Sequence, residues 1–229
     1  MMADPAFLRS IDLFADMDDA DVEAVIQRAQ LRRYPTDATI FSQGDSGSRL
    51  YIVHEGRVKI VLYAEDGRET MIAIMSPGDF LGEMSVLDGE PRSAAAVALE
   101  PVSLWYVGRD DFLACLAERP RLALKIITLL TRRLRQTDEQ VADLVFFDVF
   151  SRVAKRLLEL AETHGEPTES GTAISLSMTQ QDFANLVGAS REMVNKAFKL
   201  YRARGYLSIS KQRITVHDPD GLREHLEAS

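Results

Sequence analysis

The chain has 229 residues, 46% of them hydrophobic and 27% charged, which is typical of a globular protein with one large domain or two ordinary ones. No run approaches the roughly 18 apolar residues of a membrane span, and Met1–Asp12 lacks the apolar region of a secretory signal. One cysteine, Cys115, excludes an internal disulfide and any metal or iron–sulfur site built from cysteines. We therefore expect a cytoplasmic protein with no membrane partner, and the formal net charge of −8 argues against a chain that is basic throughout.

The first part of the chain changes character near Leu31. Before it, Pro5–Gln30 carries apolar residues at helical spacings, which predicts short helices. Alternating or β-branched runs then follow: Thr39–Phe41, Leu50–Val53, Val58–Tyr63, Thr70–Ile74, Ala94–Ala98 and Val102–Val107. Turn signals separate these runs, with glycines at intervals of eleven or twelve residues: Gly44, Gly56, Gly67, Gly78 and Gly89. Many short strands at regular spacing predict a jelly-roll-like β-domain over residues 1–120, in a chain of the α+β class.

A short helix over Arg109–Glu118 and a longer one that runs to about Phe147 are expected next. Within the long helix, a seam of residues recurs at spacings of 3, 4, 3, 4 and 3: Ile127, Leu130, Leu134, Thr137, Val141 and Leu144. This heptad pattern predicts a dimerisation helix over residues 121–147 that pairs with a like helix. The charged residues off the seam are expected to form a solvated face: Arg132, Arg133, Arg135, Asp138, Glu139 and Asp143.

Thr137 is the single polar residue of this seam. A buried hydroxyl needs a hydrogen-bond partner or it lowers stability. Thr137 therefore either bonds its own backbone one turn back or serves a purpose that the seam alone does not reveal.

The third part, residues 148–229, begins with a helix over Val149–Thr163 that Asp148 can cap, followed by a loop over His164–Gly171. Thr179 and Asp182 form a capping pair at the start of a further helix. A helix-turn-helix needs a small residue where its helices touch, a turn former at the bend and an apolar residue in the second helix. Ala184, Gly188 and Val194 supply them.

Ser190 then opens the second helix, from which Arg191, Glu192, Lys196 and Lys199 are expected to face outward. From Thr179 to Arg213 there are seven cations and two anions, a local net charge of +5 in an acidic chain. Such a basic face indicates a nucleic-acid contact confined to one end of the protein. Tyr206–Ser210 and Arg213–His217 are predicted to form a hairpin wing around Lys211-Gln212.

A second group of residues suits an anionic ligand. Gly82-Glu83-Met84 precedes Arg92-Ser93 by a short helix-like stretch. Glycine lets a ligand approach the backbone, arginine offers a bidentate fork to a phosphate, and serine adds a hydroxyl donor. A carboxylate would repel a phosphate, so Glu83 is better placed on a sugar hydroxyl. The alternative is that Glu83 and Arg92 pair with each other and bind nothing.

With these parts in this order, the whole chain resembles the Crp–Fnr family of bacterial transcription regulators. The resemblance rests on Gly82-Glu83-Met84, Arg92-Ser93, the long helix and the run Val187-Gly188-Ala189-Ser190-Arg191-Glu192. It implies a cyclic nucleotide in the β-domain, with the 2′-hydroxyl of the ribose on Glu83 and the phosphate on Arg92 and Ser93. In members that respond to cyclic AMP, two residues of the dimer helix reach the adenine, and they match Thr137 and Asp138 here.

Asp138 is a departure, because serine or asparagine is more familiar at that position, and an aspartate can accept a hydrogen bond from the adenine amino group but cannot donate one. The resemblance thus implies cyclic AMP as the effector. The alternative is a regulator of the same family that binds another nucleotide, or that binds DNA without a ligand.

The resemblance further implies a homodimer on a palindromic DNA site, with RNA polymerase as a further partner and the ligand acting by a shift of populations. Arg191 would suit guanine, Glu192 a cytosine amino group and Lys196 guanine, whereas phosphates would be contacted by Thr179, Gln181 and Lys199. The DNA-contacting set is then Thr179, Gln181, Ser190, Arg191, Glu192, Lys196 and Lys199.

Other classes of protein fit less well. A cupin-type metalloenzyme needs clustered histidines, and the four here are scattered along the sequence: His54, His164, His217 and His225. The chain lacks the N-terminal cysteine cluster of oxygen-sensing members, and Glu69–Phe80 offers no haem ligands. A kinase or channel module would leave the helix-turn-helix unexplained. We therefore expect no enzyme activity and no metal, haem or iron–sulfur cluster.

Overall fold

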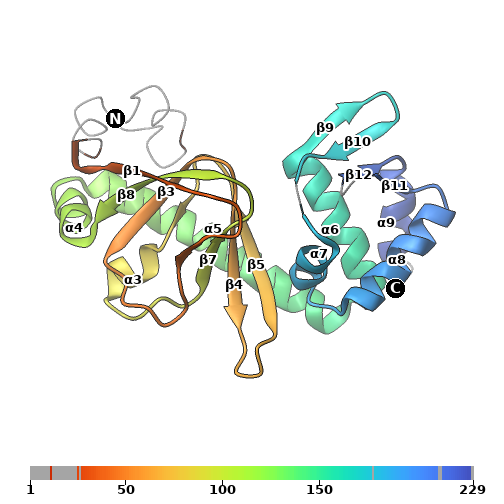
Figure 1. Ribbon diagram of the computed structural model, residues 1–229, viewed down its shortest axis with the longest axis horizontal. Helices are drawn as coiled ribbons and strands as arrows, with labels where there is room; N and C mark the ends of the chain where they lie inside the picture. The colour runs from red at the N-terminus through yellow and green to blue at the C-terminus, as the bar shows by residue number, and fades with distance from the viewer. Residues whose placement is uncertain (1–10, 12–24, 26, 177, 211–212, 228–229) are drawn as a thin grey trace. The chain divides into compact units, whose positions relative to one another are not determined.

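The computed structural model describes residues 11, 25, 27–176, 178–210 and 213–227 (Figure 1). The chain forms two compact units, Met1–Arg135 and Gln136–Ser229. This division falls within one continuous helix, α5 (Pro120–Phe146). The boundaries expected from the sequence, at residues 120 and 147, stay a prediction. Most of Pro5–Gln30, where short helices were expected, lies outside the described residues, and Gln30 is the first residue of a strand.

The first unit is built on two antiparallel sheets. One has the order β1-β8-β3-β6, from β1 (Gln30–Tyr34), β8 (Val102–Gly108), β3 (Arg49–Glu55) and β6 (Phe80–Leu81). The other has the order β2-β7-β4-β5, from β2 (Thr39–Phe41), β7 (Ala95–Ala98), β4 (Val58–Tyr63) and β5 (Glu69–Met75). The β-domain is thereby confirmed, and β2 and β4 have the bounds expected from the sequence.

Alternation along the strands creates two hydrophobic cores. Tyr51 and Val53 of β3 pack with Val58 and Ala96 of the other sheet, so this core lies between the sheets. The intervening side chain, Ile52, faces the opposite side and packs with residues of α4 (Arg109–Glu118) and α5. Because successive strand residues point to opposite faces, one strand serves both cores.

Gly44, Gly56, Gly67, Gly78 and Gly89 all have positive φ, between 74° and 96°. The turns expected at the regularly spaced glycines are therefore confirmed. At Gly56 a side chain is also excluded by space, because an added Cβ would collide with the carbonyl oxygen of Pro101.

Among its described residues, the second unit contains a four-stranded sheet and four helices beyond the end of α5. The helices are α6 (Val149–His164), α7 (Gln180–Val187), α8 (Arg191–Ala203) and α9 (Pro219–Glu227). The sheet has the order β11-β12-β10-β9, from β11 (Leu207–Ser210), β12 (Arg213–Val216), β10 (Gly171–Ile174) and β9 (Gly165–Thr168). The hairpin of β11 and β12 confirms the predicted wing, and residues 211–212 between these strands are outside the described residues.

The expectation of a loop over His164–Gly171 was wrong. This segment forms most of a second hairpin, in which β9 pairs with β10. Pro167 made the segment look irregular. Proline is tolerated on an edge strand, because its missing N–H can face away from the neighbouring strand. β9 is such an edge strand, while β10 gains its second partner from β12.

Asp148 caps α6 by accepting a hydrogen bond from the backbone N–H of Ser151 at 2.8 Å. That bond lowers the pKa of Asp148 below its ordinary value. The cap is therefore fully effective above the ordinary carboxylate pKa of about 3.9, and its contribution is lost as the pH falls through the lowered pKa.

We expect Asp148→Ala to destabilise α6 by about 1 kcal/mol at neutral pH, the usual effect of losing such a cap. Amide hydrogen exchange along α6 measures the change. Glu162→Ala, on the exposed side of the same helix, should leave exchange unaltered. A loss that persists at pH 2 would contradict an effect of the ionised carboxylate.

Candidate functional site

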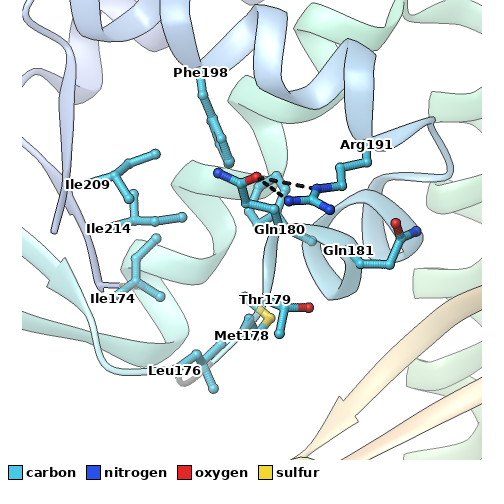
Figure 2. A pocket seen from close by; sticks show the side chains of 11 residues that line it. Ile174, Leu176, Met178, Thr179, Gln180, Gln181, Arg191, Phe198, Ile209 and Ile214 are labelled. Atoms are coloured by element: carbon cyan, nitrogen blue, oxygen red, sulfur yellow. Dashed lines mark hydrogen bonds between the residues drawn. The ribbon is translucent and has the colours of Figure 1, made fainter. Parts of the chain in front are cut away.

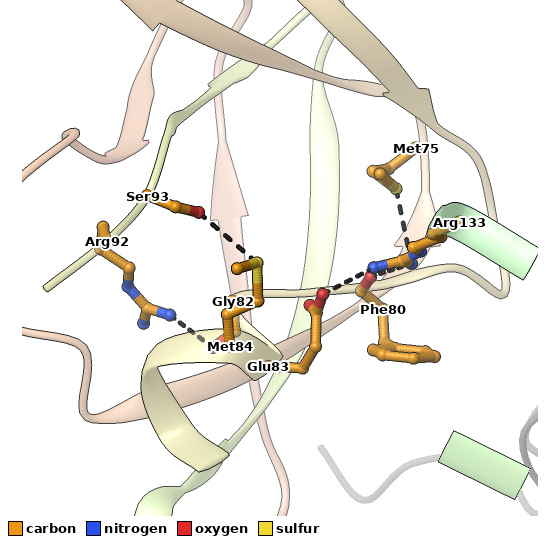
Figure 3. Close-up of polar contacts among 8 residues, drawn as sticks. All are labelled: Met75, Phe80, Gly82, Glu83, Met84, Arg92, Ser93 and Arg133. Atoms are coloured by element: carbon orange, nitrogen blue, oxygen red, sulfur yellow. Dashed lines mark hydrogen bonds and ion pairs between the residues drawn. The ribbon is translucent and has the colours of Figure 1, made fainter. Parts of the chain in front are cut away.

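The predicted ligand residues of the first unit do come together around Gly82 (Figure 3). Gly82 follows β6 and precedes the short helix α3 (Glu83–Asp88), with φ of 80°. A Cβ at Gly82 would collide with Nη1 of Arg92, and one at Gly47 would collide with Ser85. Two glycines thus keep the backbone close around Arg92 and Ser85. Gly47 was missed in the sequence, where nothing distinguishes it from a loop glycine.

Arg92 is buried, with 5% of its surface exposed. Its Nη1 donates to the carbonyl of Gly82 at 2.6 Å and its Nη2 to that of Arg49 at 2.7 Å. The guanidinium also lies 4.2 Å from the ring centre of Phe41. Burial lowers the pKa of Arg92. The hydrogen-bond partners of this cation are neutral, and the nearby carboxylates of Glu83 and Asp45 only partly offset the effect of burial on its pKa. A buried charge is stable when it is paired, so the position favours an anionic ligand.

Two buried donor atoms, one of Arg92 itself and one of Ser85, support the same conclusion. The Nε of Arg92 and the Oγ of Ser85 have no hydrogen-bond partner among the described residues. Buried polar atoms are nearly always bonded in native structures, so these two are available to a ligand. A phosphate group fits this donor set, because its oxygens accept from guanidinium and hydroxyl groups.

Glu83 is also buried, with 6% of its surface exposed. Its Oε1 lies 3.0 Å from Nη1 of Arg133, which comes from α5 and stacks on the ring of Phe80 at 4.4 Å. The expectation that Arg133 belongs to a solvated face was therefore wrong, and Glu83 is bonded to Arg133 rather than to Arg92. No sequence signal marks Arg133, because its bond to Glu83 spans 50 positions of sequence.

Met84 and Ser93 lie at the exposed side of this group. The Oγ of Ser93 donates to the Sδ of Met84 at 3.6 Å. Figure 3 shows Arg92 and Ser93 on one side of Gly82, and Glu83 and Arg133 on the other. The predicted phosphate and sugar residues are thus arranged around a single glycine.

The heptad seam of α5 is exposed in the single chain. The exposed fractions of Ile127, Leu134, Val141 and Leu144 are 54–61%, whereas Leu130 packs partly against the core of the first unit. Exposed apolar rows of this length mark interaction surfaces. Thr137 and Asp138 are exposed on the same helix. Asp143 departs from the expected solvated face, because it pairs with Lys155 at 2.6 Å.

The helix-turn-helix has the local structure that its sequence predicts. Thr179 and Asp182 form a capping box at the start of α7. Gly188 ends α7 with φ of 68°, and Ser190 caps α8 by accepting from the N–H of Met193. The rings of Phe183 and Phe198 lie 5.0 Å apart and join the two helices.

The side chains expected to contact DNA lie on the exposed surface of α7 and α8. Lys196 and Glu192 form an ion pair at 2.9 Å, and this hydrogen bond lowers the pKa of Glu192. Arg191 donates to Oε1 of Gln180 at 3.4 Å. Gln181 donates to Asn185, and the hydroxyl of Thr179 donates to Asp182. Lys199 is exposed further along α8.

A cleft of about 590 Å³ lies beneath the Arg191–Gln180 contact (Figure 2). Figure 2 shows Ile174, Ile209 and Ile214 from the strands facing this contact. Ile174 and Ile214 are themselves buried, as are Phe183 and Phe198. The apolar wall of the cleft therefore belongs to the core of the second unit, and its exposed rim is polar.

Two absences can be stated for the described part of the chain. No helix there is long and apolar enough to cross a bilayer. No group of three or more His, Cys, Asp or Glu side chains there could hold a metal ion.

A β-domain with a buried arginine beside a glycine turn, followed by a long helix and a winged helix-turn-helix, defines the class of DNA-binding regulators that carry a cyclic-nucleotide-binding domain. Residues 31–119 match the family model "cyclic nucleotide-binding domain", and residues 151–225 match "Crp-like helix-turn-helix domain". The chain belongs to the Crp–Fnr family and is a DNA-binding transcription regulator.

Relatives cover nearly the whole chain. The CRP-like cAMP-activated global transcriptional regulator of Mycobacterium tuberculosis is 37% identical over 210 residues, 92% of this chain and 94% of that protein. The cyclic AMP receptor protein of Thermus thermophilus is 32% identical over 217 residues, 95% of this chain and 97% of that protein. Among solved structures, the c-di-GMP responsive global regulator CLP of Xanthomonas campestris has a TM-score of 0.79 at 27% identity, covering 87% of this chain and 99% of that one.

Proposed function

We propose that cyclic AMP binds beside Gly82 and controls DNA binding by a homodimer of this chain. The observation that carries the proposal is the buried Arg92, whose bonded partners are neutral carbonyls and whose Nε has no partner among the described residues. The names of the Mycobacterium tuberculosis and Thermus thermophilus relatives support cyclic AMP over other anions.

Different residues around Gly82 would contact the phosphate and the ribose of the nucleotide. The Nε of Arg92, with the hydroxyls of Ser85 and Ser93, would donate to the cyclic phosphate. Arg133 bonds Oε1 of Glu83, so it orients the carboxylate and leaves Oε2 for the ribose hydroxyl. The assignment of Thr137 and Asp138 to the base stays a prediction that rests on the resemblance.

The exposed seam of α5 supports the homodimer, since a second copy offers the complementary row. A dimer presents two copies of α8 and so calls for a palindromic site. The ligand favours the DNA-binding state only by the difference in its affinity for the two states. RNA polymerase is the expected further partner, and the cytoplasm the expected compartment.

Calorimetric titration with cyclic AMP, cyclic GMP and cyclic di-GMP tests the effector. Micromolar binding of cyclic AMP and weaker binding of the others is the expected result. The solved regulator from Xanthomonas campestris makes cyclic di-GMP the second candidate, and preferential binding of that ligand would replace cyclic AMP. Binding of none of the three would contradict the proposed ligand site and leave the DNA-binding function in place.

Base reading by Arg191 is tested on a panel of DNA sites. We expect Arg191→Ala to reduce affinity by roughly 1–3 kcal/mol at one base pair and to relax the preference there. Lys199→Ala is the matched control, because loss of a phosphate contact should weaken binding equally on all sequences. Equal loss on every site for Arg191→Ala would make Arg191 a phosphate contact.

A further inference from the structure

Arg152 of α6 joins two helix ends within the second unit. Its Nη1 donates to the carbonyl of Phe147, just beyond α5, at 2.8 Å. Its Nε donates to Val187, the last residue of α7, at 3.1 Å, and its Nη2 to Gly188 in the helix-turn-helix bend at 3.2 Å. The last carbonyls of a helix lack partners within it, and a cation is favoured there. One planar guanidinium thus satisfies two helix ends.

Two further contacts fasten the end of α5 in the same place. Asp143 pairs with Lys155 of α6 at 2.6 Å, and both side chains are largely buried. Gly188 approaches Leu144 so closely that an added Cβ would lie 3.1 Å from its Cδ2. All of these residues belong to one compact unit, which also contains the last heptad of the seam. The end of the predicted dimer helix is therefore attached to the bend from which α8 starts.

We propose that Arg152 is a positioning residue that fixes α8 relative to the last heptad of α5 and so sets the spacing between DNA half-sites that the dimer accepts. This inference rests on the proposed homodimer and its palindromic site. Ser190, which caps α8, follows Gly188 by only two residues, so a shift of the bend is passed directly to the start of α8.

Spacing is the property most sensitive to this attachment. Two added base pairs move one half-site by about 7 Å and rotate it by roughly 70°, because B-DNA rises 3.4 Å per base pair and turns once in 10–10.5. A rigidly held pair of α8 helices cannot follow such a change. A pair released at the bend can follow it.

The experiment measures the affinity of the full-length dimer for DNA that carries two half-sites. The half-sites are separated by the best spacing or by two base pairs more or fewer. Wild-type protein should prefer the best spacing by about tenfold or more, and Arg152→Met should reduce this preference to less than about threefold. Affinity for a single half-site should not change. Arg156→Met is the matched control, since Arg156 lies one turn further along α6 and pairs with Glu159 of the same helix; it should keep the wild-type preference.

Arg152→Lys keeps the charge but lacks the planar fork, and it should also flatten the spacing profile, which keeps the test valid if the methionine variant unfolds. A wild-type spacing preference in a folded Arg152 variant would overturn the inference, as would an equal loss on single half-sites. If the wild-type protein bound no DNA at any spacing, the DNA-binding function itself would fail, which is a distinguishable result.

Discussion

Arg92→Ala is expected to weaken cyclic nucleotide binding by roughly 10- to 150-fold, because it removes a charge-assisted contact worth roughly 1.5–3 kcal/mol from a desolvated site. Arg92→Gln, which keeps part of the volume and one amide donor, should lose nearly as much, since the missing element is the charge. Calorimetric titration measures the affinity. Sedimentation should show an unchanged dimer, because Arg92 is buried in the first unit and is not a residue of the seam of α5.

Arg68→Ala provides the control for the loss of a cation. Arg68 belongs to the same unit but pairs with Asp66 on an exposed turn. It should bind the nucleotide as wild type does. If Arg92→Ala bound the nucleotide with wild-type affinity, Arg92 would not be part of the ligand site. The main support for a nucleotide effector would then be lost.

Leu134→Asp should convert the dimer to a monomer. In the dimer, a carboxylate at this seam position would be buried against the same seam of the second copy. An uncompensated buried charge costs roughly 3–5 kcal/mol. Because Leu134 is 61% exposed in the single chain, the fold of the monomer should change little. Sedimentation equilibrium should therefore show a rise of more than about 100-fold in the dimer dissociation constant, with binding to palindromic DNA reduced to that of one half-site.

Gln136→Asp adds the same charge two residues away, off the seam and on the exposed surface. It should leave the dimer intact. A stable dimer in Leu134→Asp would mean that copies of this chain associate through another surface, and the heptad interpretation would be wrong.

Elements that have a local sequence signal were predicted more accurately than elements that depend on long-range contacts. The strands β2 and β4 and the helix α4 were expected with the bounds they have, because alternation, turn glycines and a following proline are all short-range signals. β1 was missed, since Arg32 and Arg33 interrupt its alternation and its structure depends on pairing with β8. β6 is two residues long and has no pattern of its own.

The same difference between local and long-range signals holds for the residues of the candidate ligand site. Glu83 and Arg92 were found because both belong to short motifs. Arg133 was not, because its bond to Glu83 spans 50 positions of sequence, and a heptad pattern indicates only that a residue lies off the seam. Tertiary pairing of buried charges leaves no periodic signal.

The Glu192–Lys196 pair has a consequence for how DNA binding depends on salt. In the proposed complex with DNA these side chains would leave each other for bases and bring one negative and one positive charge, so together they would displace no net counterions. The salt dependence then comes from other cations of the surface, Arg191 and Lys199 among them. In an acidic chain of net charge −8, non-specific attraction to DNA is weak outside this surface. Two of the three proposed base-reading residues, Glu192 and Lys196, would therefore add little to the general affinity for the polyanion.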